Sequence, residues 1–104
     1  MLSLLKKAFG ISPSVNVHEW IQNGAIIVDV RTPDEFRSGH IKGSLNIPLN
    51  NLPGQLSKVD KEKQILTCCA SGMRSSSARH ILKSKGFVHV HNAGSWVSLK
   101  KYFK

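Results

Sequence analysis

Cysteine is scarce in this sequence of 104 residues, and the only two, Cys68 and Cys69, are adjacent. Adjacent cysteines cannot tie distant parts of a chain together, which excludes the disulfide framework of small secreted proteins. The chain also lacks the spaced Cys and His pairs of a zinc site, so we expect no metal. These absences favour a reducing compartment, and we expect the protein to be cytoplasmic.

Long apolar runs are absent as well. No segment approaches the roughly 20 apolar residues that span a bilayer, so we expect no membrane span. Lys6 and Lys7 interrupt the apolar start of the chain before a signal-peptide core can form. We expect residues 1–14 to be a leader outside the domain. It can form a short amphipathic helix with Leu2, Leu5 and Phe9 on one side.

Acidic residues are missing from the second half of the chain. All six Asp and Glu precede residue 63, whereas residues 63–104 contain eight Lys or Arg. Charge alone favours a solvated basic surface over an anionic partner for this half. Because the half also contains Cys69 and the residues that follow it, we predict that its positive field helps to keep Cys69 ionised and attracts small anions. Because the basic residues are scattered and no aromatic-rich binding motif accompanies them, we expect no specific nucleic-acid partner.

Length and composition fit one globular domain, which we place at residues 15–104. Short apolar strand patterns alternate with helix patterns along it. The predicted strands cover residues 25–30, 44–47, 64–68 and 87–91, and the predicted helices cover 17–22, 33–38, 49–59, 75–85 and 95–102. This alternation predicts an α/β fold with a mostly parallel central sheet and helices on both faces.

The segment after Cys69 combines small residues, a glycine and an arginine between a predicted strand and a predicted helix. Backbone N–H groups of such a loop, and of the helix that follows, can converge on one point and stabilise a thiolate there. Gly72 permits a positive φ, and Arg74 can bind loop carbonyls or an anion. A cysteine in a small loop can also be a buried apolar residue, but the surrounding pattern favours a nucleophile.

Four separated motifs extend this pattern over almost the whole chain from about Val15. They are Cys69-x-x-Gly72-x-Arg74-Ser75; Val28-Asp29-Val30-Arg31 with Pro33-Asp34-Glu35-Phe36; Gly39-His40-Ile41-x-Gly43-Ser44-x-Asn46-Ile47-Pro48; and Gly86-Phe87 through Asn92 to Gly94 and Trp96. In this order they resemble the single-domain rhodaneses, a family of sulfurtransferases. The resemblance implies a rhodanese-like domain.

The resemblance also implies a reaction. Cys69 would take the outer sulfur atom of a donor such as thiosulfate or a persulfide, and would pass it to cyanide or a thiol. By family analogy the backbone amides that hold this sulfur belong to the active-site loop: Ala70, Ser71, Gly72, Met73 and Arg74. No cofactor is required. A small anionic donor, a thiol or cyanide acceptor and a sulfur-relay protein are the expected partners.

Two alternatives stay open at this point. Related phosphatases and arsenate reductases place one residue more between Cys and Arg than the four that separate Cys69 from Arg74 here. The shorter loop favours a sulfur atom over a phosphoryl group. A rhodanese-like module with weak catalysis, used for protein binding or sulfur relay, is the second alternative. The presence of both Cys69 and Arg74 argues against it.

Asp29 and Arg31 are supporting residues of the predicted site. Asp29 ends an apolar strand, where a carboxylate is better suited to bracing backbone than to acting as a general base. For Arg31 we expect a structural ion pair first and a contact to substrate second. Cys68 precedes Cys69 on the same strand, so its side chain should point to the opposite face, into the core.

Overall fold

The computed structural model describes residues 14–103, so the predicted leader lies outside the described residues except for Ser14. In chain order the elements, with η marking a 3-10 helix, are α2 (Val17–Gln22), β1 (Ile26–Asp29), α3 (Pro33–Ser38), β2 (Leu45–Asn46), η1 (Leu49–Gly54), η2 (Leu56–Lys58), β3 (Gln64–Cys69), α4 (Met73–Ser84), β4 (His89–Ser95) and η3 (Trp96–Tyr102). In the described part of the chain, no helix is long and apolar enough to cross a bilayer.

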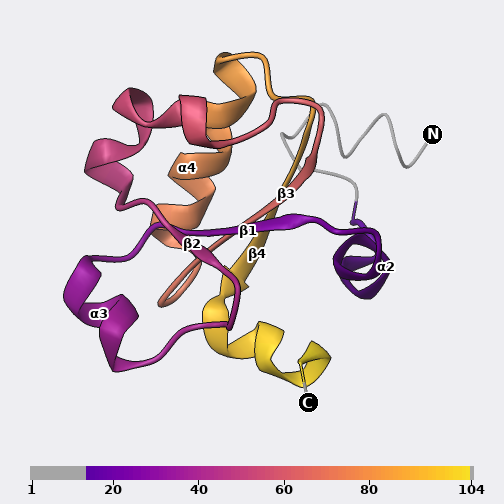
Figure 1. Ribbon diagram of the computed structural model, residues 1–104, viewed down its shortest axis with the longest axis vertical. Helices are drawn as coiled ribbons and strands as arrows, with labels where there is room; N and C mark the ends of the chain where they lie inside the picture. The colour runs from indigo at the N-terminus through magenta and orange to yellow at the C-terminus, as the bar shows by residue number, and fades with distance from the viewer. Residues whose placement is uncertain (1–13, 104) are drawn as a thin grey trace.

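The four strands form one sheet in the order β2-β1-β3-β4, and every neighbouring pair is parallel (Figure 1). Parallel strands bring all their carboxyl ends to one edge, which is where α/β sheets bind ligands. β3 ends at Cys69. The predicted nucleophile therefore lies at the edge of the sheet that is used for binding.

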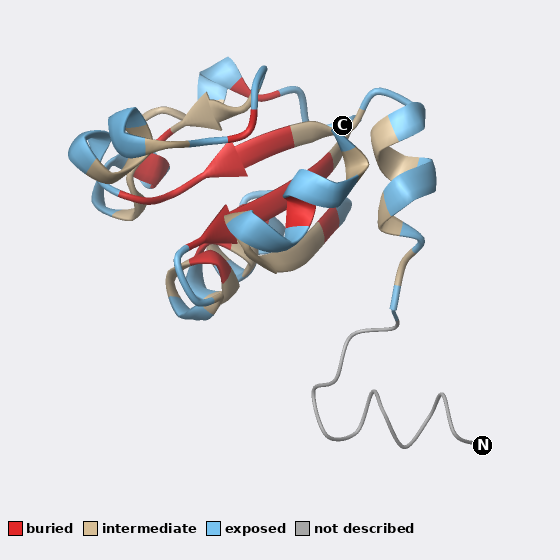
Figure 2. Cartoon of the chain, turned by 90° about the horizontal axis from the view of Figure 1, so that it is seen from below, coloured by how far each residue is buried: buried red, intermediate tan, exposed pale blue. Residues whose placement is uncertain are grey.

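Side chains of the strands alternate between two core layers. Ile65 and Cys69 belong to the layer that is closed by α4, η1 and η2. Leu66 and Cys68 belong to the opposite layer, which is closed by α2 and η3. Figure 2 shows the buried strands between the more exposed helices. The predicted α/β sheet with helices on both faces is confirmed, and so is the opposite orientation of the two cysteines.

Helix starts follow the local sequence. At α2, the Asn16 side chain accepts a hydrogen bond from the Glu19 backbone N–H. At α3, the Thr32 hydroxyl accepts from the Glu35 N–H while the Glu35 carboxylate accepts from the Thr32 N–H, a complete capping box. Such a cap stabilises a helix by about 1 kcal/mol. It holds α3 in place at the carboxyl edge of the sheet.

Three predicted elements differ from those observed by more than a shift of one or two residues at their ends. Residues 49–59 form two short 3-10 helices rather than one α-helix, because Pro53 inside η1 has no N–H to donate. The last strand begins at His89 and runs to Ser95, whereas the prediction placed it at 87–91; Phe87 is instead a buried core residue before the strand. The terminal helix is also 3-10, with Leu99 buried but Phe103 41% exposed.

Candidate active site

Cys69 is followed by a three-residue loop, Ala70 to Gly72, and α4 begins at Met73, two residues earlier than predicted. The loop can be this short because Gly72 takes a φ of +103° and serves as the N-cap of α4. The left-handed conformation turns the chain back over the end of β3. Of the predicted loop residues, Met73 and Arg74 therefore lie in the first helical turn, while Ala70, Ser71 and Gly72 form the loop itself.

The Cys69 sulfur receives several hydrogen bonds from this turn. The backbone N–H of Gly72 donates to Sγ at 3.0 Å, and the backbone N–H of Ser75 donates at 3.4 Å. The hydroxyl oxygen of Ser75 lies 3.4 Å from the same sulfur. Cys69 is only 1% exposed, yet polar N–H groups surround its sulfur. This is the environment of a reactive thiolate rather than of an apolar core cysteine.

The two cysteines have opposite acidities. Burial raises the pKa of the Cys69 thiol, but hydrogen bonds from the Ser75 hydroxyl and from the amides of Ser75, Gly72 and Ser71 outweigh it, so the pKa lies below its ordinary value. Burial and the nearby Asp29 carboxylate raise the pKa of Cys68 to about 12. At neutral pH, Cys68 is an inert thiol, and Cys69 is the cysteine prepared for nucleophilic attack.

Ser75 and Asn92 contribute to the site, although neither was among the predicted site residues. The Ser75 hydroxyl is hydrogen-bonded to the Asn92 side chain at 2.6 Å, and the Thr67 hydroxyl donates to the Ser75 carbonyl at 2.9 Å. Asn92 also donates to the Gly72 carbonyl at 3.1 Å. Ser75 stood within the Cys-Gly-Arg-Ser motif, which was a usable signal. Asn92 lay in a separate motif, and only the fold brings it to Ser75.

Arg74 pairs with a carboxylate that was not among the predicted site residues. Its guanidinium donates to both carboxylate oxygens of Glu35 on α3, at 2.7 and 3.0 Å, instead of to the loop carbonyls. Chiefly through this pairing, the pKa of Glu35 falls from 4.5 to about 2. The pair links the first turn of α4 to α3, which helps to hold the loop of Ala70 to Gly72 in position.

The Glu35–Arg74 pair predicts a pH dependence of stability. Because the pKa of Glu35 is lower in the folded state than in the unfolded chain, the pair stabilises the fold above about pH 4.5 and this contribution disappears as pH falls towards 2. Wild type should therefore have a higher melting temperature than Glu35→Gln at pH 6, and the difference should shrink on acidification. Thermal unfolding followed by circular dichroism measures this. A difference that stays constant down to pH 2 would contradict it.

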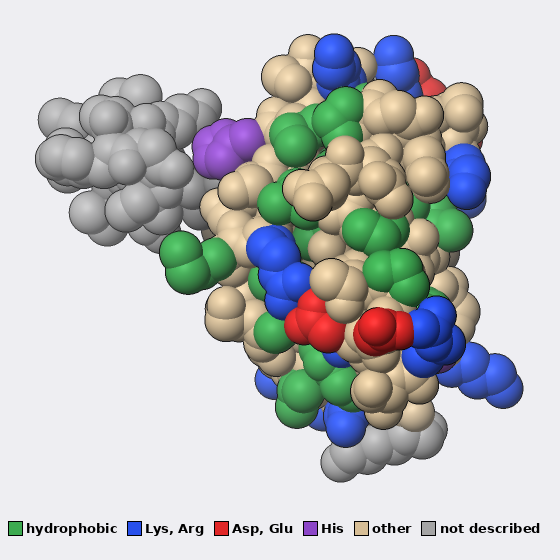
Figure 3. Space-filling view, turned by 90° about the vertical axis from the view of Figure 1, so that its left-hand side faces the viewer, with side chains coloured by type: hydrophobic (Ala, Val, Ile, Leu, Met, Phe, Trp, Pro, Cys, Tyr) green, Lys and Arg blue, Asp and Glu red, His purple; other side chains and the backbone are tan. Residues whose placement is uncertain are grey.

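Charges on the surrounding surface are mixed. Figure 3 looks onto the side of the molecule where α3 lies, and red carboxylates there adjoin blue basic groups. Two ion pairs contribute, Glu35 with Arg74 and Asp34 with Arg37. Among the causes that lower the pKa of Cys69, the hydrogen bonds at its sulfur are the largest. Arg74 and Cys69 also interact through their charges, and a wider contribution from the basic second half of the chain stays a prediction.

Asp29 and Arg31 form the expected structural pair. Both are buried, and the Arg31 side chain donates to both carboxylate oxygens of Asp29 at 2.7–3.0 Å. Arg31 also donates to the carbonyls of Glu35 and Gly39, and its guanidinium stacks over Trp96 at 4.6 Å. The pair therefore braces the turn from β1 into α3. These contacts stabilise the carboxyl edge of the sheet, where Cys69 lies.

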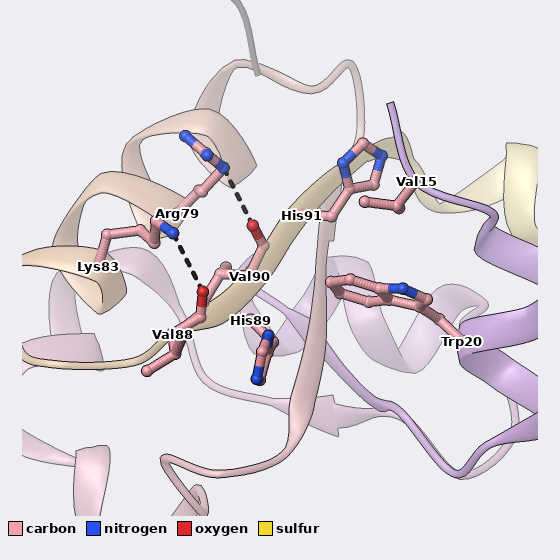
Figure 4. Close-up of a pocket in the computed structure, with 8 residues that line it drawn as sticks. All are labelled: Val15, Trp20, Arg79, Lys83, Val88, His89, Val90 and His91. Atoms are coloured by element: carbon pink, nitrogen blue, oxygen red, sulfur yellow. Dashed lines mark hydrogen bonds between the residues drawn. The ribbon is translucent and has the colours of Figure 1, made fainter. Parts of the chain in front are cut away.

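A cleft lies at the outer edge of β4, away from the Cys69 sulfur (Figure 4). Two basic side chains of α4 bind the carbonyls of this edge: Arg79 donates to Val90 and Lys83 donates to Val88, each at 3.1 Å. An uncovered edge strand invites pairing with another chain, and charged side chains on it prevent this. No residue of the Cys69 loop lines the cleft. We therefore assign these two residues to protection of the edge.

The groups that surround the Cys69 sulfur are side chains and backbone amides of the chain itself. Within residues 14–103, no cluster of His, Cys, Asp and Glu has the geometry to hold a metal ion. The site contains a buried cysteine sulfur and backbone N–H groups that can stabilise negative charge on it. The contacts of Arg74 with Glu35 and of Ser75 with Asn92 hold these N–H groups in position. Such a site suits covalent catalysis, in which a group is carried on sulfur between two displacement steps.

Comparison with known proteins identifies relatives of this site and fold. Residues 15–101 match the family described as the rhodanese-like domain. Thiosulfate sulfurtransferase PspE of Escherichia coli is 35% identical over 69 residues, covering 64% of this chain and 66% of that protein. Thiosulfate sulfurtransferase GlpE of Stutzerimonas stutzeri is 34% identical over 80 residues, covering 77% of this chain and 73% of that protein.

Solved structures agree with the sequence matches. A human single-domain sulfurtransferase superposes with a TM-score of 0.75 at 26% identity, over 86% of this chain and 96% of that one. A rhodanese with anions from E. coli gives a TM-score of 0.67 at 33% identity, over 71% of this chain and 89% of that one. The structural likeness thus extends over most of the chain.

Proposed function

Because this chain belongs to the rhodanese-like domain family, we propose that it is a sulfurtransferase that carries a sulfane sulfur atom on Cys69. The observation that carries this proposal is the Cys69 sulfur itself, with the Gly72 and Ser75 amides donating to it at 3.0 and 3.4 Å. These donors stabilise negative charge on the sulfur before attack. The loop amides predicted for the transferred sulfur, those of Ala70, Ser71, Gly72, Met73 and Arg74, belong to the same turn.

The proposed reaction has two displacements. In the first, the Cys69 thiolate attacks the outer sulfur of thiosulfate, a new S–S bond forms on Cys69, and the donor's S–S bond breaks with its electron pair leaving on sulfite. In the second, cyanide or a thiolate attacks the outer sulfur of the persulfide and the electron pair returns to Cys69. Each step conserves charge and needs no external oxidant.

Loop length supports sulfur as the cargo. Four residues separate Cys69 from Arg74, and the loop proper ends at Gly72, where α4 starts. Both terminal nitrogens of Arg74 are engaged by the Glu35 carboxylate, so the guanidinium is poorly placed to clamp the equatorial oxygens of a phosphoryl group. A phosphatase reaction therefore has neither the wide cradle nor the free guanidinium that it needs.

Steady-state kinetics test the proposed function. With thiosulfate and cyanide varied together, thiocyanate formation should show the parallel double-reciprocal lines of a ping-pong mechanism. An aryl phosphate should be hydrolysed far more slowly than sulfur is transferred. Replacing thiosulfate with glutathione persulfide identifies the preferred donor. Phosphate release that equals or exceeds thiocyanate formation would contradict the proposal, as would intersecting lines.

A further inference from the structure

The Ser75 hydroxyl lies between two groups that could accept its hydrogen. Its oxygen is 2.6 Å from the Asn92 side-chain oxygen and 3.4 Å from the Cys69 sulfur. A serine hydroxyl has a single hydrogen to donate, together with lone pairs that accept. Ser75 can therefore donate to Asn92 or to Cys69, but not to both at once.

Backbone contacts fix which end of the Asn92 amide faces Ser75. The Gly94 N–H donates to Asn92 Oδ1 at 2.9 Å, and Asn92 Nδ2 donates to the Gly72 carbonyl at 3.1 Å. Reversing the amide would put two donors together at Gly94 and two acceptors together at Gly72. The oxygen of Asn92 therefore faces Ser75, and because this oxygen only accepts, the Ser75 hydrogen points towards Asn92.

The sequence folds to this arrangement through an irregularity in β4. Asn92 pairs with Thr67 and Gly94 pairs with Cys68, so Ala93 is one residue more than the β3–β4 ladder needs. A bulge of this kind bends a strand and re-aims the side chains next to it. Here it lets Asn92 reach Ser75 while the Gly94 N–H still reaches Asn92 Oδ1.

The protonation of Cys69 changes what its sulfur requires from Ser75. A neutral thiol can donate its hydrogen to the Ser75 oxygen, which completes a chain from Cys69 through Ser75 to Asn92. A thiolate can only accept, so a Ser75 oxygen that turns its lone pairs towards the sulfur is unfavourable. Rotation about the Cβ–Oγ bond of Ser75 moves the hydrogen from Asn92 to the sulfur and so satisfies the thiolate. Asn92 Oδ1 then keeps the Gly94 N–H as its donor but faces an acceptor oxygen of Ser75, so Asn92 opposes this rotation.

We propose that Asn92 is a positioning residue that holds the Ser75 hydroxyl away from the Cys69 sulfur in the thiol and persulfide states and releases it to the sulfur in the thiolate state. The assignment of the persulfide state rests on the proposed function. In a persulfide the negative charge lies on the outer sulfur, so Sγ no longer requires the Ser75 hydrogen. Ser75 keeps its own proton throughout, and only the direction of its hydrogen bond alternates.

The charged groups near Cys69 each have partners other than Ser75 and Asn92. Arg74 of α4 is held by Glu35 of α3, and Cys68 is an un-ionised thiol on the other face of β3. His91 on β4 belongs with Trp20 of α2, on the opposite side of the sheet from Ser75. The remaining charges near the cysteines form the buried pair of β1, Asp29 and Arg31. Substitution of Asn92 by an uncharged residue therefore leaves these charges unchanged, while it removes the hydrogen bonds of Asn92 with Ser75, Gly94 and Gly72.

The test is the pH dependence of Cys69 alkylation by iodoacetamide, in a Cys68→Ala background so that a single thiol reacts. Ser75→Ala should raise the midpoint of the profile by about half to one pH unit, the value of one hydrogen bond to a thiolate. Asn92→Ala should lower it by a few tenths of a unit, because the Ser75 hydrogen is no longer shared. Ser75→Thr, which keeps the hydroxyl, should restore a profile close to that of wild type.

The double variant decides between positioning and general support. With Ser75→Ala already present, Asn92→Ala should leave the midpoint where Ser75→Ala placed it. The proposal would be overturned if Asn92→Ala shifted the midpoint equally with Ser75 and with Ser75→Ala, or if it caused no shift when Ser75 is present. If Asn92→Ala does not fold, the isosteric Asn92→Asp carries the test: it should raise the midpoint, and more so when Ser75 is present. Alkylation needs no sulfur donor, so this result stands apart from whether sulfur is transferred.

Discussion

Cys69→Ser should lose thiocyanate formation by at least about a thousandfold, as expected when a covalent nucleophile is removed. A serine hydroxyl at this position has the same amide donors around it but remains protonated at neutral pH, and it cannot accept a sulfane sulfur. The fold should be retained, because oxygen replaces sulfur in a place where Gly72 and Ser75 already offer hydrogen bonds. The assay is initial-rate thiocyanate formation from thiosulfate and cyanide.

Cys68→Ala is the matched control for this variant. Cys68 is fully buried in the opposite core layer and its pKa is raised to about 12, so it contributes no nucleophile. Alanine leaves a small cavity but introduces no buried polar group. Cys68→Ala should keep most of the activity at a slightly lower melting temperature. Comparable losses of activity in the two variants would show that the chemistry does not belong to Cys69.

Gly72→Ala should lower kcat/KM for thiosulfate by about ten- to a hundredfold. A positive φ costs a non-glycine residue about 1–2 kcal/mol. If the backbone relaxes to avoid this strain, the N–H group that donates to the Cys69 sulfur moves with it. Space is lacking as well: an added Cβ would lie 3.3 Å from the Gly94 Cα, which is backbone and cannot turn aside. The loop must therefore shift, and its amide at 3.0 Å from the sulfur shifts with it. Kinetics and the pH profile of Cys69 alkylation measure the loss.

Gly43→Ala provides the control for backbone strain. Gly43 has a φ of +86°, close in kind to the +103° of Gly72, but an added Cβ there meets nothing within 4 Å. Both variants should lose stability through the left-handed conformation. Only Gly72→Ala should also lose activity and shift the reactivity of Cys69 to higher pH. Equal activities in the two variants would contradict the role given to the loop amides.

Local signals allowed much of the fold to be predicted. The run of Thr32, Pro33 and Glu35 predicted a capped helix, and a capping box is present there. Apolar strand patterns in alternation with helices predicted a parallel sheet. The adjacency of Cys68 and Cys69 predicted that they face opposite layers. These predictions were reliable because each depends on residues within one turn or one strand of each other.

Contacts that form only in the folded chain were not predictable. Arg74 meets Glu35 from 39 residues away, and Ser75 meets Asn92 from 17 residues away. The position of β4 depends on a bulge at Ala93, which has no clear local signature. The sequence indicated that the Cys69 loop would gather N–H donors, but the identity of the residues that brace those donors depends on the packing of α3, α4 and β4.

The most direct test of a sulfur-carrying Cys69 is a mass measurement on the protein after incubation with thiosulfate and removal of small molecules. One added sulfur atom is expected on the peptide that contains Cys69, in wild type and in Cys68→Ala, and dithiothreitol should remove it. No added sulfur in Cys68→Ala, or the same added sulfur in Cys69→Ser, would contradict the persulfide mechanism.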